Sequence, residues 1–134
     1  MITGFNHLTL TVSNLKNSLE FYQHLLGFDL KVTWDKGAYL TANDFWLCLN
    51  LGDPQPAQCY THYAFSVSQA DLTEFRKRLL EHPLPSWQDN HSEGDSLYLL
   101  DPDGHRLELH VGNLESRLKS LVQKPYSGLV WHSE

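Results

Sequence analysis

Strand-like and helix-like hydrophobic patterns alternate along this chain, and their order occurs twice. The first stretch, about 5–12, places Leu8 and Leu10 on one face and His7 on the opposite, polar face. A helix-like stretch follows, with Asn14 as a typical N-cap. Gly27 is typical of the residue that ends such a helix. The expected apolar stripe of this helix is Leu15, Leu19, Tyr22 and Leu26. Three more strands are predicted, at about 28–34, 37–42 and 45–51.

The second half of the chain repeats this order after the polar, proline-bearing segment at 53–56. His7 and His62 are 55 residues apart, and so are Val12 and Val67. A turn is expected at 101–104. The predicted elements are a strand at 60–67, a helix at 70–81, strands near 86–89, 96–100 and 105–111, and a last helix at about 113–122.

Each half therefore predicts a βαβββ module, and the fold class is α+β with two paired modules. We expect one domain over 1–134, with modules at about 4–52 and 58–112 and a C-terminal helix and tail at 113–134. A four-stranded sheet with one helix cannot cover both of its faces, so the sheets should pack around a common cleft.

Composition narrows the possible partners. The net charge of -6 argues against nucleic acid as a partner. No stretch of about 18 apolar residues predicts a membrane span. No export signal is recognisable at the N-terminus, and Cys48 and Cys59 form no CxxC motif, so free thiols in a reducing cytosol and a cytoplasmic protein are expected.

Two histidines in matching positions and one late carboxylate suggest a metal site. A single strand histidine is usually structural, but the repeat makes His7 and His62 a candidate pair. Glu108 lies between leucines in its strand, so alternation turns it to the other face, where the cleft is expected. Its counterpart in the first module is about Cys48. Two imidazoles and one carboxylate suit a divalent transition metal with open positions for substrate.

The other histidines lack a symmetric partner and are expected at the surface, although His110 shares a strand face with Glu108. The polar segment 90–96 is typical of a hairpin loop, and its carbonyls and hydroxyls suit a monovalent cation equally well. Tyr98 and Arg117 offer donors to an anion, although an arginine on a terminal helix is usually exposed.

Taken together, these motifs resemble the glutathione-dependent fosfomycin resistance proteins of the vicinal-oxygen-chelate (glyoxalase and bleomycin resistance) superfamily. The resemblance covers nearly the whole chain. Its most specific parts are Tyr60-Thr61-His62-Tyr63-Ala64-Phe65 and Ser92-Glu93-Gly94-Asp95-Ser96. Further matches are His7-Leu8-Thr9-Leu10, Trp34-Asp35, Gly37-Ala38-Tyr39-Leu40, Trp46-Leu47-Cys48-Leu49, and the run from Asp101 to Glu108.

The resemblance implies a domain-swapped homodimer with shared active sites. It implies Mn²⁺, or another divalent metal, held by His7 of one subunit and by His62 and Glu108 of the other. Fosfomycin would bind the metal, and glutathione would attack its epoxide carbon next to the methyl group. The metal would act as a Lewis acid on the oxirane oxygen.

The resemblance also implies roles for individual residues. Tyr39 would assist the thiol, whose thiolate form is the nucleophile, and Trp46 would wall the pocket. The phosphonate would be held by Thr9, Ser92, Tyr98 and Arg117. A potassium ion would be bound by Asn90, Ser92, Gly94 and Ser96.

One departure bears on catalysis. Gln88 stands where the family usually has a lysine near the substrate, and His91 stands where an arginine is common. Both changes weaken the positive field, since glutamine supplies only a dipole. Alternatives are a related epoxide hydrolase, a glyoxalase-like enzyme on another small anionic substrate, and a non-enzymatic antibiotic-binding protein. The hydrolases carry a glutamate near Gly37-Ala38 that this chain lacks, and the binding proteins lack the metal triad.

Overall fold

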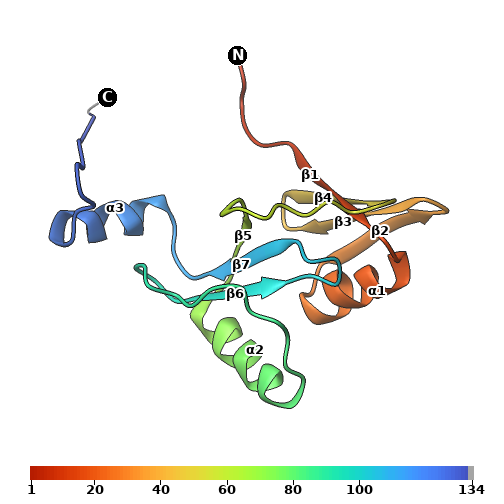
Figure 1. Cartoon of the computed structure of the whole chain (residues 1–134). Coiled ribbons are helices and arrows are strands. Elements are labelled where there is room, and N and C mark those ends of the chain that lie inside the picture. The colour runs from red at the N-terminus through yellow and green to blue at the C-terminus, as the bar shows by residue number, and fades with distance from the viewer. Residues whose placement is uncertain (133–134) are drawn as a thin grey trace. The chain divides into compact units, whose positions relative to one another are not determined.

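The computed structural model describes residues 1–132 and forms two compact units. The first unit contains Met1–Thr61 together with Asp101–His105, and the second contains His62–Leu100 and the described residues from Arg106 onward. Figure 1 shows a sheet with short helices in each. Among the described residues, no helix has the length and apolar character needed to cross a bilayer.

The first unit contains a four-stranded sheet in the order β1-β4-β3-β2. Strand β1 runs parallel to β4, whereas β3 is antiparallel to both of its neighbours. Leu10, Val12, Leu40, Leu47 and Leu49 are buried, as the predicted alternation requires. The strands are β1 His7–Val12, β2 Asp29–Trp34, β3 Gly37–Ala42 and β4 Phe45–Leu51, close to the predicted bounds.

The helix of the first unit differs from the predicted regular helix. It begins as α1 Leu15–Leu19, where Asn14 accepts a 3.0 Å hydrogen bond from the amide of Asn17. It then widens into a π-helical segment, η1 Glu20–Leu25. The wider turn rotates the buried face, so Ser18, Phe21 and Tyr22 are buried while Leu15, Leu19 and Leu26 of the predicted stripe are only half-buried. Gly27 ends the helix with a φ of 84°, as predicted.

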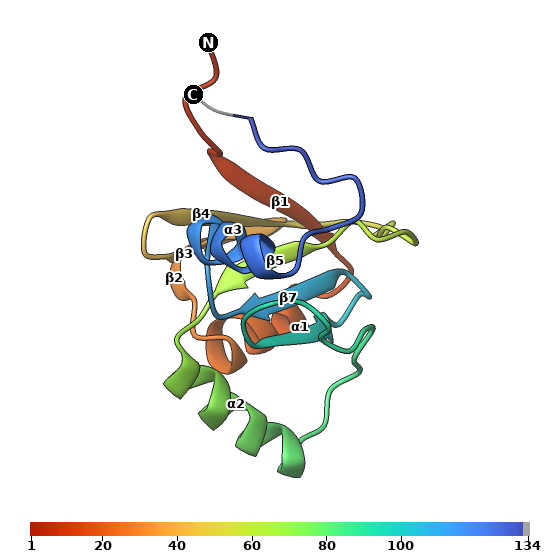
Figure 2. The same cartoon turned by 90° about the vertical axis from the view of Figure 1, so that its left-hand side faces the viewer.

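The second unit contains a three-stranded sheet in the order β5-β7-β6. Its elements are β5 Tyr63–Ser66, α2 Gln69–Glu81, β6 Ser96–Leu100, β7 Arg106–His110 and α3 Leu114–Gln123. Helix α2 lies on one side of this sheet (Figures 1 and 2). Leu72, Phe75 and Leu107 are buried.

The strand predicted near 86–89 does not form. Only one bridge, between Ser86 and Leu99, occurs there. Pro83 and Pro85, which have no backbone N–H, lie directly before this stretch, and the carbonyl of Pro85 accepts a 3.1 Å bond from the amide of Leu100. A loop therefore replaces the fourth strand of the second module.

The turn at 101–104 forms as predicted, but it belongs to the first unit. The hydroxyl of Tyr22 donates a buried 2.7 Å hydrogen bond to Asp101. Nε2 of His105 lies 2.8 Å from the carbonyl oxygen of Thr11, and Ser13 donates to Asp103. The prediction of a surface position for His105 is therefore wrong, since this side chain is buried between the turn and β1.

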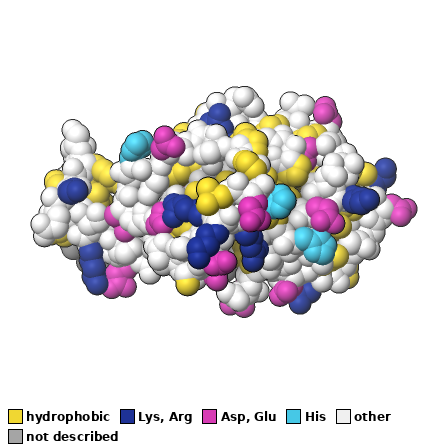
Figure 3. Space-filling model, turned by 90° about the horizontal axis from the view of Figure 1, so that it is seen from below, with side chains coloured by type: hydrophobic (Ala, Val, Ile, Leu, Met, Phe, Trp, Pro, Cys, Tyr) yellow, Lys and Arg dark blue, Asp and Glu magenta, His cyan; other side chains and the backbone are white. Residues whose placement is uncertain are grey.

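Charge on the surface is mixed rather than gathered. Acidic and basic side chains alternate over the face drawn in Figure 3, which shows no wide region of one sign. This agrees with a modest net charge of -6 and gives no basic surface for a polyanion on that face.

Candidate metal and substrate site

His62 and Glu108 come together in the second unit because β5 and β7 are neighbours. His62 directly precedes β5, and Ala64 lies opposite Glu108 in the parallel register. Nε2 of His62 is 3.0 Å from Oε1 of Glu108. Both side chains are largely shielded from solvent, with 20% and 9% of their surfaces exposed. A buried carboxylate is tolerated only where hydrogen-bond donors or cations pair with its oxygens.

This pair fits two ligands of one divalent ion. Ligand atoms about 2.1 Å from a six-coordinate ion lie about 3 Å apart when they occupy neighbouring positions. The separation of Nε2 and Oε1 matches that spacing. Imidazole and carboxylate suit Mn²⁺ and related metals. Within residues 1–132, no three His, Cys, Asp or Glu side chains lie close enough to hold a metal ion, so the described residues supply a pair.

Aromatic side chains surround the pair. Tyr98 on β6 lies opposite Glu108 and is buried, and its ring centroid is 6.3 Å from that of His62. Trp87 packs edge-on against Tyr98 at 5.1 Å and lies 5.2 Å from His62. Nε1 of Trp87 donates a 2.9 Å bond to the carbonyl of Leu107, which fixes the ring. Trp87 had no role predicted from sequence, although a tryptophan between a proline and polar residues was a usable signal.

The loop that replaces the missing strand is organised by Asn90. Its Nδ2 donates to the carbonyl of Gly94 at 2.8 Å, and its Oδ1 accepts from the amide and the hydroxyl of Ser92 at 3.2 and 3.1 Å. Gly94 has a φ of 75°, and a Cβ there would collide with the carbonyl of Val111. Asn90, Ser92 and Gly94 thus converge. Ser96 instead opens β6 and donates a 2.7 Å bond to Glu108.

Arg117 reaches the same loop from α3. Its Nη2 donates to the hydroxyl of Ser92 at 3.3 Å, Nη1 to the hydroxyl of Tyr126 at 3.2 Å, and Nε to Glu93 at 3.2 Å. Burial lowers the pKa of Arg117, but the hydrogen bonds to Tyr126 and Glu93 raise it by more, so the net shift is upward. The guanidinium is therefore a permanent cation held in one orientation. Sequence reasoning missed Glu93 and Tyr126, which set that orientation.

Gln88 lies in the segment between Trp87 and the Asn90 loop and is half-buried. Its carbonyl accepts a 3.1 Å bond from the hydroxyl of Ser86. The position flanks the residues around His62 and Glu108, so a charge placed there would act on the same region of the second unit.

The first unit places its candidate residues on one face of its own sheet. His7 lies opposite Trp46, and Thr9 and Tyr39 both lie opposite Cys48. The ring of Trp46 stacks on His7 at 4.4 Å and meets Tyr39 edge-on at 5.1 Å. These four side chains form a continuous surface of one imidazole, two aromatic rings and one hydroxyl.

His7 is oriented for ligation. Its Nδ1 lies 2.7 Å from Oδ1 of Asn6, and an amide oxygen only accepts, so Nδ1 carries the proton. Nε2 is then the nitrogen with the lone pair, as a metal ligand requires. Nε1 of Trp46 is buried and has no hydrogen-bond partner among the described residues.

The sequence and the fold of this chain are similar to those of known proteins. The sequence profile of the Glyoxalase/Bleomycin resistance protein/Dioxygenase superfamily matches residues 4–109. The chain is 46% identical over 139 aligned positions to the glutathione transferase FosA of Serratia marcescens, covering 100% of this chain and 99% of that protein. It is 42% identical to the metallothiol transferase FosB of Shouchella clausii, covering 88% and 86%.

A solved structure is also similar. A mutant of the fosfomycin resistance protein FosX from Listeria monocytogenes, in complex with Mn(II) and 1S,2S-dihydroxypropylphosphonic acid, gives a TM-score of 0.77. The two chains are 29% identical, and the match covers 88% of this chain and 99% of that one.

Proposed function

We propose, because this chain belongs to the Glyoxalase/Bleomycin resistance protein/Dioxygenase superfamily, that it is a metal-dependent glutathione transferase that inactivates fosfomycin. The observation that carries the proposal is the full-length similarity to a glutathione transferase, at 46% identity. The adjacent His62 and Glu108 support it, since they offer two ligands in a shielded site.

The metal ligands in this proposal are His62, Glu108 and His7 of the partner subunit. Mn²⁺ is the first choice, supported by the Mn(II) in the similar FosX structure, although the same ligand types accept other divalent metals. When bound, the ion would withdraw electron density from the oxirane oxygen and weaken its bond to carbon.

The phosphonate group of fosfomycin would bind to one arginine and three hydroxyl groups. Arg117 supplies the charge, and its three hydrogen bonds within the second unit hold it still before substrate arrives. Ser92 and Tyr98 add donors from the same unit, and Thr9 adds one from β1. Charge-assisted hydrogen bonds of this kind are about twice as strong as neutral ones.

Glutathione is the proposed second substrate. Its sulfur would form a bond to the oxirane carbon that bears the methyl group while the carbon–oxygen bond breaks. The oxygen keeps the electron pair and takes up a proton, and the thiol has lost one, so the overall addition balances. Tyr39, exposed beside Trp46, would accept a hydrogen bond from the thiol or stabilise the thiolate, which is the nucleophilic form. Trp46 would wall this pocket.

A potassium ion is proposed at Asn90, Ser92, Gly94 and Ser96. The carbonyl oxygens of Ser92 and Gly94 already converge on one point, the side-chain amide of Asn90. A monovalent cation would replace that amide as their partner, which requires Asn90 to turn. Equal rates in potassium and tetramethylammonium buffers would remove this part of the proposal.

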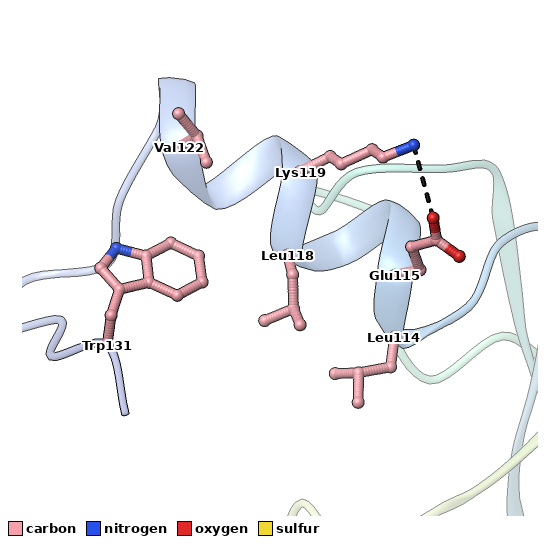
Figure 4. Close-up of a pocket in the computed structure, with 6 residues that line it drawn as sticks. All are labelled: Leu114, Glu115, Leu118, Lys119, Val122 and Trp131. Carbon is pink, nitrogen blue, oxygen red and sulfur yellow. Dashed lines mark ion pairs between the residues drawn. The ribbon is translucent and has the colours of Figure 1, made fainter. Parts of the chain in front are cut away.

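Two copies of the chain are proposed to share their sites. Exposed apolar side chains support association, because large apolar patches usually mark interaction surfaces. Leu114, Val122 and Trp131 are 73%, 68% and 55% exposed. With Leu118 they line a groove on the outer side of α3, with the Glu115–Lys119 ion pair at its rim (Figure 4).

Subunit mixing tests the shared site. A His7→Ala chain and a Glu108→Ala chain should each be inactive alone. In hybrid dimers one of the two sites keeps all three ligands, so mixing should restore a fraction of the activity. Confirmed hybrids that stay inactive would place all three ligands of a site within one chain.

Hydrolysis is the alternative reaction, and the similarity to FosX favours it. Water would then replace the thiol and the product would be a diol. The structure offers no carboxylate at Gly37 or Ala38 to act as the base expected of such a hydrolase. Tyr39 and the surrounding aromatic rings suit a thiol better than they suit activation of water.

The decisive experiment follows fosfomycin by ³¹P NMR with glutathione, in the presence of Mn²⁺ and after chelation. We expect a thioether adduct that forms only with both metal and glutathione. His62→Ala is the matched control and should abolish the reaction. A diol formed without glutathione would establish the hydrolase instead, and binding without turnover would establish a sequestering protein.

A further inference from the structure

The carboxylate of Glu108 is held at both oxygens. Oε1 lies 3.0 Å from His62, and Oε2 accepts a 2.7 Å hydrogen bond from the hydroxyl of Ser96. Glu108 is only 7% exposed, and Ser96 only 3%, so water does not compete for this bond. The hydroxyl therefore determines how the carboxylate plane is turned.

The hydroxyl of Ser96 has a second close neighbour, Nδ1 of His110 at 2.6 Å. A hydroxyl carries one proton, and Oε2 of an ionised carboxylate carries none. If Ser96 gave its proton to His110, two bare oxygens would face each other at 2.7 Å in a buried place. Nδ1 of His110 must therefore carry a proton and donate it to Ser96, and Ser96 then donates to Glu108. This holds whether or not Nε2 also carries a proton.

The ring of His110 is fixed in a narrow slot. A Cβ on Gly94 would lie 2.9 Å from Cε1 of the ring, and one on Gly112 would lie 2.9 Å from Nε2. These glycines have φ values of 75° and 140°. On its far side Nε2 lies 3.8 Å from Glu93, the carboxylate that also binds Arg117. The edge of the imidazole that carries Cε1 and Nε2 is thus packed closely against Gly94 and Gly112, which restricts rotation of the ring.

The first unit provides an internal control. In the strand registers, Gly37 lies opposite Asn50 as Ser96 lies opposite His110, and Tyr39 lies opposite Cys48 as Tyr98 lies opposite Glu108. The first unit therefore has neither the carboxylate nor the serine and histidine. At these register positions the hydroxyl and the imidazole occur only in the repeat that carries the proposed carboxylate ligand.

We propose that Ser96 and His110 are positioning residues for Glu108, forming a relay from Nδ1–H through the hydroxyl to Oε2 that aims Oε1 at the metal. The inference rests on the proposed metal site. Hydrogen-bond partners of metal ligands typically contribute about 10–100-fold to metal affinity. Both side chains should therefore act on metal binding even with no substrate present.

Mn²⁺ affinity of the full chain, measured by calorimetry without fosfomycin or glutathione, tests the relay. Ser96→Ala and His110→Gln should each weaken binding by at least about tenfold. His110→Asn should stay within about threefold of the wild type, since its amide nitrogen is as many bonds from Cβ as Nδ1 and can donate in its place. The glutamine amide reaches one bond further and misses Ser96.

A double variant checks that His110 acts through Ser96. Ser96→Ala/His110→Gln should bind Mn²⁺ at most slightly more weakly than Ser96→Ala alone, because the hydroxyl through which the histidine acts is gone and the direct approach of Nδ1 to Oε2, at 3.4 Å, is long for a hydrogen bond. Asn50→Gln, at the counterpart position, should leave affinity unchanged. Thermal unfolding of each variant separates a loss of affinity from a loss of fold. Wild-type affinity in folded Ser96→Ala and His110→Gln, or additive losses in the double variant, would overturn the inference.

His62→Ala distinguishes this inference from the proposed function. If His62→Ala loses Mn²⁺ while Ser96→Ala binds it with wild-type affinity, the proposed metal site is supported and the positioning role of Ser96 is wrong. If His62→Ala keeps stoichiometric Mn²⁺, the proposed metal site itself is wrong and the relay with it.

Discussion

The two units share the arrangement of three strands, β1-β4-β3 in the first and β5-β7-β6 in the second, but differ in the residue at the middle of the central strand. In the first, Cys48 lies between Thr9 and Tyr39; in the second, Glu108 lies between Ala64 and Tyr98. Each position lies on a strand that pairs in parallel with a strand at whose start a histidine is found, His7 for β1 and His62 for β5. A repeat that keeps its backbone can therefore hold a thiol in one half and a charged carboxylate in the other.

The neighbours of these two positions explain why the carboxylate is tolerated in only one of them. Glu108 has a hydroxyl and an imidazole within reach, whereas the counterparts in the first unit are Gly37 and Asn50. Burying a carboxylate without such partners costs several kcal/mol, so a single change of Cys48 to glutamate would not create a second site. The asymmetry involves three positions together.

Removing the carboxylate should have the largest effect. Glu108→Gln keeps the shape but not the charge, and should weaken Mn²⁺ binding by at least about 100-fold, above the range for outer-shell groups. Cys48→Ala, the same position in the other unit, should change it by no more than about twofold. Calorimetric titration of the two variants with Mn²⁺ measures both. Comparable losses would mean that the Cys48 thiol also takes part in the metal site.

Much of this asymmetry follows from sequence alone. Alternation in β7 predicted that Glu108 faces away from Leu107, and the spacing of the repeat paired it with Cys48; the strand registers agree. Local periodicity succeeds there because one face of each strand is buried, and a slip of one residue would exchange the faces.

Other features could not be predicted because they depend on contacts distant in sequence. Apolar periodicity assumes a regular helix, so it did not predict the π-helical segment η1. A strand was predicted near 86–89, but only one bridge forms there. Whether such a stretch pairs with β6 depends on residues distant in sequence, which local patterns do not report. The partners of Arg117, Glu93 and Tyr126, lie 24 and 9 residues away. Hydrogen bonds between such residues leave no periodic trace.

Adding a side chain at Gly37 should destabilise the first unit. An added Cβ would lie 2.5 Å from the carbonyl oxygen of Leu49 and 2.6 Å from the ring of Trp34. Overpacking of this kind costs about 1–3 kcal/mol. We expect Gly37→Ala to lower the free energy of unfolding by that amount in urea. Gly4→Ala, which meets nothing within 4 Å, is the control. If Gly37→Ala leaves the free energy of unfolding unchanged, this position could also accept a serine, and the difference from Ser96 in the second unit would not be set by lack of space.

Restoring a charge at Gln88 should have a smaller effect, and it concerns only the second unit. A charged donor exceeds a neutral one by roughly 1 kcal/mol, so Gln88→Lys should raise kcat/KM for fosfomycin about fivefold. Steady-state kinetics with saturating glutathione separates the parameters. A gain confined to KM would mean that the lysine binds ground and transition states alike. A loss would mean that the site has compensated for glutamine, and other anionic epoxides should then be tested.

The smallest effect concerns how each helix is attached to its unit. In the first unit the helix is attached by a buried hydrogen bond, which the neutral hydroxyl of Tyr22 donates to the carboxylate of Asp101. In the second it is an ion pair at the surface, in which Arg76 of α2 grips both oxygens of Asp95 and also reaches the carbonyl of Ser96. The bond from Arg76, with a second from Gln69, holds the pKa of Asp95 well below its ordinary value of 3.8.

Arg76→Ala should therefore destabilise the chain by at most about 1 kcal/mol at pH 7, because both side chains are partly exposed and solvent screens the pair. A carboxyl group with a lowered pKa stabilises the fold above its unfolded-state value and loses that contribution as the pH falls. The difference in the free energy of unfolding between wild type and variant should reach its largest value above about pH 5 and should decrease below about pH 4. Urea unfolding at pH 7, 5, 4 and 3 measures it, with Arg78→Ala, an exposed arginine of the same helix, as the control. A difference that stays constant down to pH 3 would mean that Arg76 acts through packing and its bond to Ser96 rather than through the charge of Asp95.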